Sequence, residues 1–142
     1  MEPRKGFAIS WDVFENGSMN QPLALILYER LLPGTQLVNR LQDLNYRVQT
    51  VDDAKLLVTE AEQVKPMLVL ADLEATRGNA CAAIAQLKQN PATQHLPVIA
   101  FARENGPELQ EAAHAAGVTF LVTETALLNH LPQFLDQALQ LD

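Results

Sequence analysis

The sequence has little or none of several features, and each shortage excludes a class of protein. Cys81 is its single cysteine, so an internal disulfide is impossible and a reducing compartment is indicated. No apolar run approaches the roughly 18 residues that span a bilayer. Residues 1–20 also lack the continuous apolar centre of a signal peptide. These shortages predict a cytoplasmic protein, with Cys81 a small buried thiol in an alanine-rich helix.

Sites for catalysis, cofactors and metals are missing as well. Serine does not occur after Ser18, which excludes a Gly-x-Ser-x-Gly nucleophile in the rest of the chain. No glycine-rich phosphate-binding motif is present, so we expect no nucleotide or flavin cofactor. The three histidines, His95, His114 and His130, are scattered without metal-ligand spacing, and we predict surface histidines and no metal. A net charge of −7 argues against binding to nucleic acid, whose phosphate backbone requires a basic footprint.

The first 18 residues do not belong to the pattern that follows. Met1–Ser18 holds both serines and Trp11, the only tryptophan, and Gly17–Ser18 directly precedes a second methionine, Met19. We interpret Met1–Ser18 as an extension added by cloning or as an appended peptide; the alternative is a genuine leader. Residues 19–142 then form one domain, and that length is enough for a real core.

The remaining chain alternates strand and helix patterns. Met67–Leu73 is a continuous apolar run interrupted only by Asp72, as in a central strand covered on both faces. The other predicted strands are Leu23–Tyr28, Tyr46–Val51, Val98–Ala102 and Val118–Thr123. Five such strands alternating with five helices predict an α/β fold, a doubly wound parallel sheet of order 2-1-3-4-5.

The helices are predicted from apolar spacing and from capping residues. After a turn at Pro33–Gly34, the first helix has Leu37, Val38, Leu41 and Leu44 on one face. The second is capped by Asp52 or Asp53 and ends at Lys65–Pro66, and its apolar face is Ala54, Leu57, Val58, Ala61 and Val64. The third follows Asn79 with Ala82, Ala83, Leu87 and, less strongly, Ile84; the fourth lies between Gly106–Pro107 and Gly117, and the last is Asn129–Leu141, with Pro132 in its first turn.

Two carboxylates fall where such a sheet places its chemistry. Glu29 follows the first strand and Asp72 ends the third, and these two strands are neighbours in the predicted order. The carboxyl ends of parallel strands meet at one edge of the sheet, so we expect Glu29 and Asp72 to lie close together. Without a functional role, they would be two solvated acids.

The chain from Leu23 to Leu141 resembles the receiver domain of response regulators, the CheY-like family. The segments that carry the resemblance are KPMLVLADL, LKQNPATQHLPVIAF and AAHAAGV, which match that family in sequence and spacing. The resemblance implies a CheY/flavodoxin-like fold and places the phospho-acceptor at Asp72.

The other phosphorylation residues of the family are missing. The two acids that hold magnesium in receivers match Tyr28 and Glu29, and the conserved Thr or Ser of the fourth strand matches Ala102. The lysine after the fifth strand matches Glu124, or Thr123 with a one-residue shift, and no lysine occurs after Lys88. The loop before Gly78 is short, with Thr76 where proline is common. Phosphoryl transfer depends on metal and charge neutralisation, so Asp72 with Tyr28 and Glu29 is predicted to be a vestigial pocket.

These observations predict a pseudo-receiver that acts as a phosphorylation-independent protein interaction module in bacterial signalling. Two alternatives stay open: a phospho-accepting response regulator that uses Asp72, and a small α/β enzyme or cofactor binder on the same fold. We expect the partner to be another signalling protein, with a homodimer as a further option.

The resemblance also places an interaction face at Glu104–Asp142. This segment contains six acids and no lysine or arginine, so a symmetric dimer through it would bring like charges together. We therefore predict a partner with a basic face, contacted by Glu108, Glu111 and the apolar Leu127 and Leu128.

Overall fold

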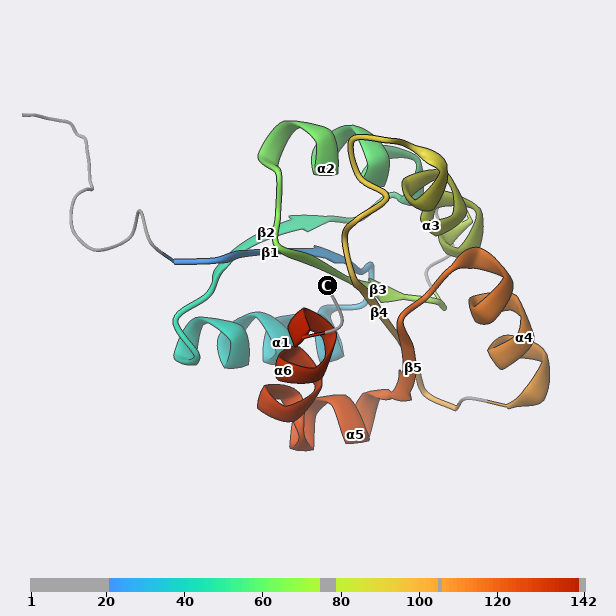
Figure 1. The fold of residues 1–142 in the computed structure, drawn as a ribbon. Helices are drawn as coiled ribbons and strands as arrows, with labels where there is room; N and C mark the ends of the chain where they lie inside the picture. The colour runs from blue at the N-terminus through green and yellow to red at the C-terminus, as the bar shows by residue number, and fades with distance from the viewer. Residues whose placement is uncertain (1–20, 75–78, 105, 141–142) are drawn as a thin grey trace, which may run out of the picture.

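A computed structural model describes residues 21–74, 79–104 and 106–140, and its centre is a five-stranded parallel sheet (Figure 1). The strands are β1 (Leu23–Leu27), β2 (Arg47–Val51), β3 (Leu68–Asp72), β4 (Val98–Ala102) and β5 (Phe120–Thr123). Their order is β2-β1-β3-β4-β5, and every neighbouring pair is parallel. The predicted doubly wound fold is therefore confirmed.

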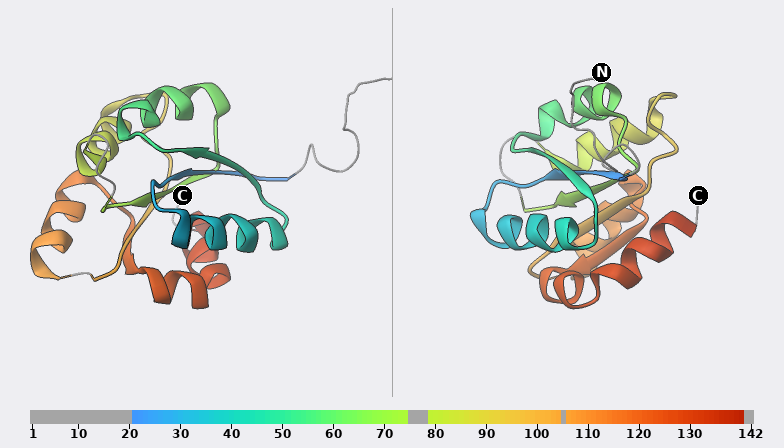
Figure 2. Two further views of the ribbon diagram at one scale, coloured as in Figure 1. Left: turned by 180° about the vertical axis from the view of Figure 1, so that it is seen from behind. Right: turned by 90° about the vertical axis from the view of Figure 1, so that its left-hand side faces the viewer.

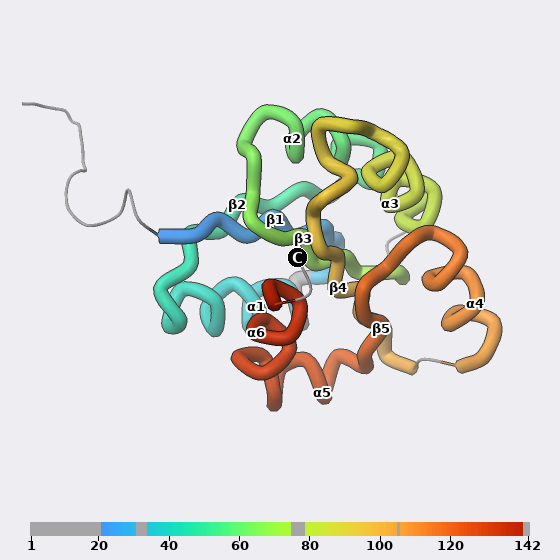
Figure 3. The backbone as a smooth tube through the Cα atoms, viewed as in Figure 1, coloured from blue at the N-terminus to red at the C-terminus, as the bar shows by residue number. Residues whose placement is uncertain are grey.

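The helices are α1 (Leu31–Asp43), the 3₁₀ turn η2 (Ala54–Leu56), α2 (Leu57–Val64), α3 (Ala80–Gln89), α4 (Pro107–Ala116), α5 (Glu124–Asn129) and α6 (Leu131–Gln140). Helices α2 and α3 cover one face of the sheet, while α1, α5 and α6 cover the other (Figure 2). β3 and β4 are buried at every position because they receive cover from both sides. In the tube of Figure 3, the chain runs from β1 outward to β2 and then returns through β3 and β4 to β5.

Most predicted boundary residues act as expected. The side chain of Asp53 accepts a hydrogen bond from the Lys55 N–H at the start of η2, and that of Asn79 accepts one from the Ala82 N–H at the start of α3. Gly117 ends α4 in the left-handed conformation, with φ 97°. Lys65 ends α2 in the same region, with φ 51°.

The region of Pro33 and Gly34 was predicted wrongly as a turn. Both residues lie inside α1, whose first turn can hold proline because the backbone N–H groups there have no helical partner. Gly34 is buried beneath the ring of Tyr28, which occupies the space where a Cβ atom would lie. The helix ends at Asp43, so Leu44 lies outside its buried face and is 37% exposed.

The predicted last helix, Asn129–Leu141, is found as α6 with a start two residues later, whereas the short helix α5 before it was not predicted. α5 begins directly after β5, where the Thr123 hydroxyl accepts a hydrogen bond from the Ala126 N–H. One continuous helix cannot follow, because Pro132 has no N–H for the bond four residues back. The chain therefore breaks at His130, and Pro132 lies in the first turn of α6.

Two smaller corrections concern α3. Its buried stripe is Ala80, Ala83, Ile84 and Leu87, so Ile84 belongs to the core and Ala82 is exposed. Cys81 is half-buried rather than buried, and desolvation raises the pKa of its thiol.

The interpretations of Met1–Ser18, Thr76 and Gly78 lie outside the described residues. Each helix within the described ranges is too short or too polar to span a bilayer.

Candidate functional site at the carboxyl edge

Asp72 lies at the carboxyl end of the central strand β3, and its side chain is fully buried. One carboxylate oxygen, Oδ1, accepts a hydrogen bond of 2.9 Å from the Glu74 N–H. The other, Oδ2, lies 3.1 Å from Nε and 3.0 Å from Nη2 of Arg30. Both oxygens of the buried carboxylate are therefore engaged by donors from the protein itself.

Arg30 lies between the end of β1 and the start of α1, and it bridges three acids. Besides Asp72, its Nη2 atom forms a hydrogen-bonded ion pair with Oε2 of Glu124, the first residue of α5. Its Nη1 atom lies 4.0 Å from Oε1 of Glu74. The planar guanidinium suits this position because its fork of donors can serve several carboxylates at once.

Glu74 extends the network to a further loop. It accepts a 2.7 Å hydrogen bond from the Arg103 N–H, and its Oε1 lies 3.2 Å from Arg103 Nε. We call Arg30, Asp72, Glu74, Arg103 and Glu124 the Arg30 network. Its members come from the ends of β1, β3, β4 and β5, so charge pairs connect four loops at one edge of the sheet.

Burial and charge act against each other at Asp72. Desolvation raises the pKa of its carboxyl, and the charge of Glu124 adds to this rise. The Glu74 N–H and Arg30 act in the opposite direction but do not cancel the rise. At Arg30, desolvation lowers the pKa, yet Glu124 and Asp72 together outweigh it and the net shift is upward. The buried acid thus depends on Arg30 for its compensation.

No family model and no curated protein matches the sequence. Many solved structures do match the fold. A putative response regulator from Chloroflexus aurantiacus is 15% identical, with 84% of this chain and 98% of that chain covered and a TM-score of 0.79. The chain has the receiver fold.

Two further structures have the same fold. The receiver domain of a sensor histidine kinase from Pseudomonas aeruginosa, solved with magnesium in its active-site cleft, is 19% identical. It aligns over 84% of this chain and 98% of its own, with a TM-score of 0.78. The chemotaxis protein CheY4 of Vibrio cholerae is 16% identical over 83% of this chain and 98% of its own, with a TM-score of 0.76.

The residues at this edge of the receiver fold do not fit a magnesium ion. Magnesium prefers near-octahedral oxygen ligands with more than one carboxylate available. Here the positive guanidinium of Arg30 lies against Asp72 and is paired with Glu124, so it would repel a divalent cation at the same place. The described residues contain no group of three or more His, Cys, Asp or Glu side chains arranged to hold a metal.

Tyr28 and Glu29 lie to one side of the Arg30 network. They line a shallow depression with residues of β2 and the following turn, among them Gln49, Thr50 and Leu56. The ring of Tyr28 packs over Gly34 and against the core on the α1 face. The side chain that contacts Asp72 from this loop is Arg30, the residue after Glu29.

The residues predicted to replace the receivers' switch residues make other contacts here. Ala102 is fully buried at the end of β4 and offers no hydroxyl, and the Thr123 hydroxyl caps α5. Glu124 occupies the position predicted for a replaced lysine, and its side chain is 18% exposed. The three histidines are exposed, as predicted.

The predicted interaction face is only partly available at the surface. Glu104, Glu108 and Glu111 are exposed. Leu127 was wrongly predicted as a surface contact, because α5 turns it into the core, where it is 1% exposed. Leu128 is half-buried, and Glu124 is engaged with Arg30.

Sequence reasoning missed Arg30 altogether. Apolar periodicity locates core residues, whereas Arg30 acts through charge over 42 and 94 positions of sequence. One signal was available: a glutamate follows the fifth strand, where the family has lysine, and an arginine directly follows the two positions that match the family's acids. Opposite charges at two strand ends of the same edge favour an ion pair.

Proposed function

We propose that this chain is a pseudo-receiver, a phosphorylation-independent protein interaction module in bacterial signalling, which works in the cytoplasm. The observation that carries the proposal is the Arg30 guanidinium bound to Asp72 and Glu124. The receiver fold supports a signalling role, and the contacts of Asp72 support silence toward phosphorylation.

The state of the Asp72 carboxylate disfavours attack on a phosphoryl donor. A nucleophilic oxygen must be free to approach phosphorus in line. Oδ2 is held by Arg30 and Oδ1 by the Glu74 N–H, and the side chain is fully buried. Reaction would require loss of the ion pair while Asp72 remained in a poorly hydrated position.

The charges around Asp72 also oppose the product. A phosphoryl group would add negative charge beside Glu74 and Glu124, and the described residues supply neither a metal site nor a lysine there to neutralise it. Arg30 is the cation that remains against Asp72, and it is shared with Glu124. Where phosphorylation would add negative charge, this chain has the positive guanidinium of Arg30, which connects the loops that follow β1, β3 and β5.

The test is exposure of the protein to acetyl phosphate with magnesium, followed by intact-mass measurement. We expect no mass gain, while a phospho-accepting receiver treated in parallel gains one phosphoryl group. The matched control is Asp72→Asn, which should give the same unmodified spectrum as the native chain. A hydroxylamine-sensitive mass gain that disappears in Asp72→Asn would show a working phospho-receiver instead.

A second measurement examines the same site without covalent chemistry. Beryllofluoride with magnesium imitates an acyl phosphate, so amide chemical shifts around Asp72 should stay unchanged. Shifts centred on Asp72 and Glu74 would overturn the proposal.

The interaction itself is proposed to use the acidic surface of α4. Glu108 and Glu111 are exposed there, and the described part of Glu104–Asp142 contains no lysine or arginine. Like charges oppose a symmetric dimer through α4, so this surface fits a basic partner. We expect association through α4 to weaken with salt and with the paired change Glu108→Lys and Glu111→Lys.

A further inference from the structure

A basic surface lies at the amino edge of the sheet, opposite to the Arg30 network. A depression there is lined by Arg47, Lys65 and His95 around the apolar Pro66 and Met67, and no acid is among its lining residues. Met67 is 50% exposed. In a chain with 17 acids and 10 lysines and arginines, this local excess of positive charge runs against the overall balance.

The two cations of this depression are available to a partner. Arg47 and Lys65 are exposed, and neither forms an ion pair within the described part of the chain. Arg47 makes one hydrogen bond of 3.3 Å to a backbone carbonyl, that of Gln21. Lys65 has a φ of 51°, a conformation that side chains other than glycine and asparagine disfavour. The backbone conformation at this position favours glycine or asparagine, so it does not explain why a lysine is found there.

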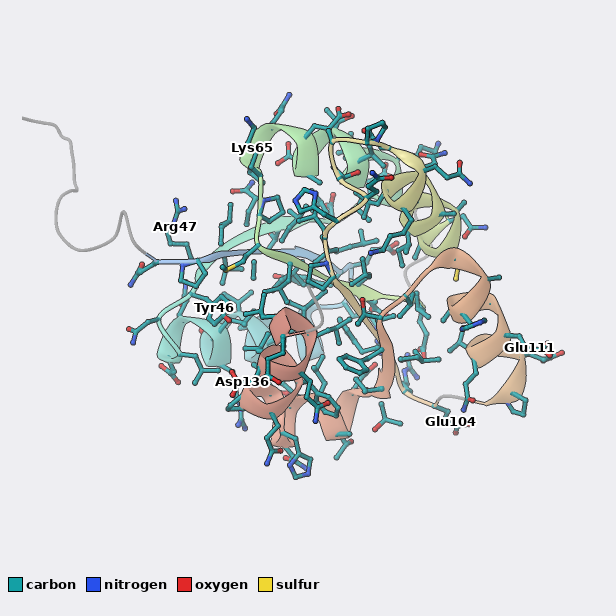
Figure 4. All side chains as sticks on the ribbon, viewed as in Figure 1. Tyr46, Arg47, Lys65, Glu104, Glu111 and Asp136 are labelled. Carbon is teal, nitrogen blue, oxygen red and sulfur yellow. The ribbon has the colours of Figure 1, made fainter. Side chains whose placement is uncertain are left out.

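A surface of complementary character lies on the other side of the molecule. Beside Glu111, a depression between α4 and β5 is lined by the apolar Ala113, Val118 and Leu121, together with Pro107 and the polar Gln110, His114 and Thr119. Glu104 and Glu108 add exposed negative charge close to it in sequence. Figure 4 shows Arg47 and Lys65 on one side of the molecule and Glu104 and Glu111 on the opposite side.

We propose that copies of this chain associate head to tail, with the amino-edge depression of one copy against the α4–β5 depression of the next. Arg47 and Lys65 would face Glu108 and Glu111, and the exposed Met67 would contact the apolar lining residues. This inference rests on the proposed function, since it names the basic partner of the α4 surface as a second copy.

The position of the two surfaces fixes the form of the assembly. A contact between unlike surfaces is heterologous, and it leaves one free surface of each kind at the ends of every oligomer. Because the surfaces lie on opposite sides, successive copies should extend into an open chain rather than close as a dimer. The contact also avoids the like-charge repulsion that a symmetric α4 dimer would have.

The test is sedimentation velocity of the full chain over a concentration series at low salt. We expect the weight-average mass to rise continuously beyond that of a dimer. Two double variants separate the surfaces: Arg47→Glu with Lys65→Glu, and Glu108→Lys with Glu111→Lys. Each alone should weaken association by roughly tenfold or more, because like charges then meet. Lys55→Glu, an exposed reversal outside both depressions, should leave association unchanged.

Mixing the two double variants is the decisive arm. Each variant carries one altered and one native surface. The acidic amino edge of the first variant is complementary to the basic α4 surface of the second, and the native surfaces of the two variants remain complementary to each other. An equimolar mixture should therefore regain large species that neither variant forms alone. Met67→Asp, which keeps all the cations, should also weaken association.

A monomer at every concentration overturns the proposal, as does a closed dimer or a mixture that fails to reassemble from folded variants. Assembly that resists both double variants would place the contact elsewhere and overturns it too. Repeating the series with acetyl phosphate and magnesium keeps the two proposals separate. A mass gain on Asp72 contradicts the proposed function alone, whereas loss of self-association leaves that function standing with a different basic partner.

Discussion

The two edges of the sheet carry charge in opposite ways. At the carboxyl edge, two arginines and three acids are paired with one another, and Asp72 is fully buried. At the amino edge, Arg47 and Lys65 are exposed and have no ion pair within the described residues. The difference indicates that the first set of charges holds the fold together, while the second remains available for binding.

This contrast reverses the usual expectation for an open α/β sheet. Ligands of such sheets bind at the carboxyl ends of the strands. Here the charged side chains at the end of β3 are paired within the Arg30 network, while exposed charges lie at the amino edge and along α4. Changes at the two edges should therefore have effects of different size and on different properties.

The largest effect is expected for Arg30→Ala. This change leaves Asp72 buried without its cation, and loss of one partner of a buried pair costs about 3–5 kcal/mol. Arg47→Ala, at the exposed amino edge, should change the free energy of unfolding by no more than about 0.5 kcal/mol. Urea denaturation of both variants measures the difference, and equal losses would contradict the contrast between the edges.

A smaller effect is expected for Glu124→Gln. It keeps the size of the side chain but removes the charge that pairs with Arg30, and the loss should be about 1–2 kcal/mol because the glutamate is partly exposed. The matched control is Glu111→Gln on the surface of α4, which should be close to neutral. A double-mutant cycle with Arg30→Ala should show coupling, since both changes break the same contact.

Gly34→Ala tests close packing at the carboxyl end of β1. A Cβ atom at this position would overlap the ring of Tyr28, whereas at Gly106, at the start of α4, it would meet nothing within 4 Å. Overpacking costs about 1–3 kcal/mol and should exceed the roughly 1 kcal/mol that alanine contributes to a helix. Thermal unfolding should therefore show a net loss for Gly34→Ala and little change for Gly106→Ala.

The smallest effect is the dependence on pH that comes from Asp72. Its pKa in the folded chain is raised above the ordinary value of 3.8, chiefly by burial, so the folded state binds this proton more tightly than the unfolded state. The contribution of Asp72 to stability is therefore most favourable at low pH and is lost as the pH rises through the folded pKa.

Asp72→Asn removes that titration. The stability of the native chain relative to this variant should fall as the pH increases from about 4 toward neutrality. Urea unfolding at several pH values measures the difference. A constant difference, or one that grows more favourable with pH, would show that Arg30 outweighs burial.

The fold was predictable because its signals are local. The continuous apolar runs of β3 and β4 and the capping residues of η2 and α3 are visible in the sequence, and Val98–Ala102 was predicted with its observed bounds. The helix α5 was not predicted, because its six residues are too few to show an apolar period, whereas α6 was predicted with Pro132 in its first turn.

The site was less predictable than the fold. Asp72 was placed correctly at the sheet edge with Glu29 as an expected neighbour, but its partner Arg30 was overlooked. The reason is that polar side chains pair according to reach and charge across distant loops, which no periodicity records. Only the opposite charges of Arg30 and Glu124, which follow the first and fifth strands, pointed to the observed contact.

The separation of Arg30 from its partners in the sequence has a consequence for the order of folding. Its contacts with Asp72 and Glu124 close loops of 42 and 94 residues, so they require β3 and β5 to be in place first. A late contact of this kind contributes little to the folding transition state, and its loss appears mainly as faster unfolding. The Arg30 network would thus slow unfolding of the chain and leave its rate of folding almost unchanged.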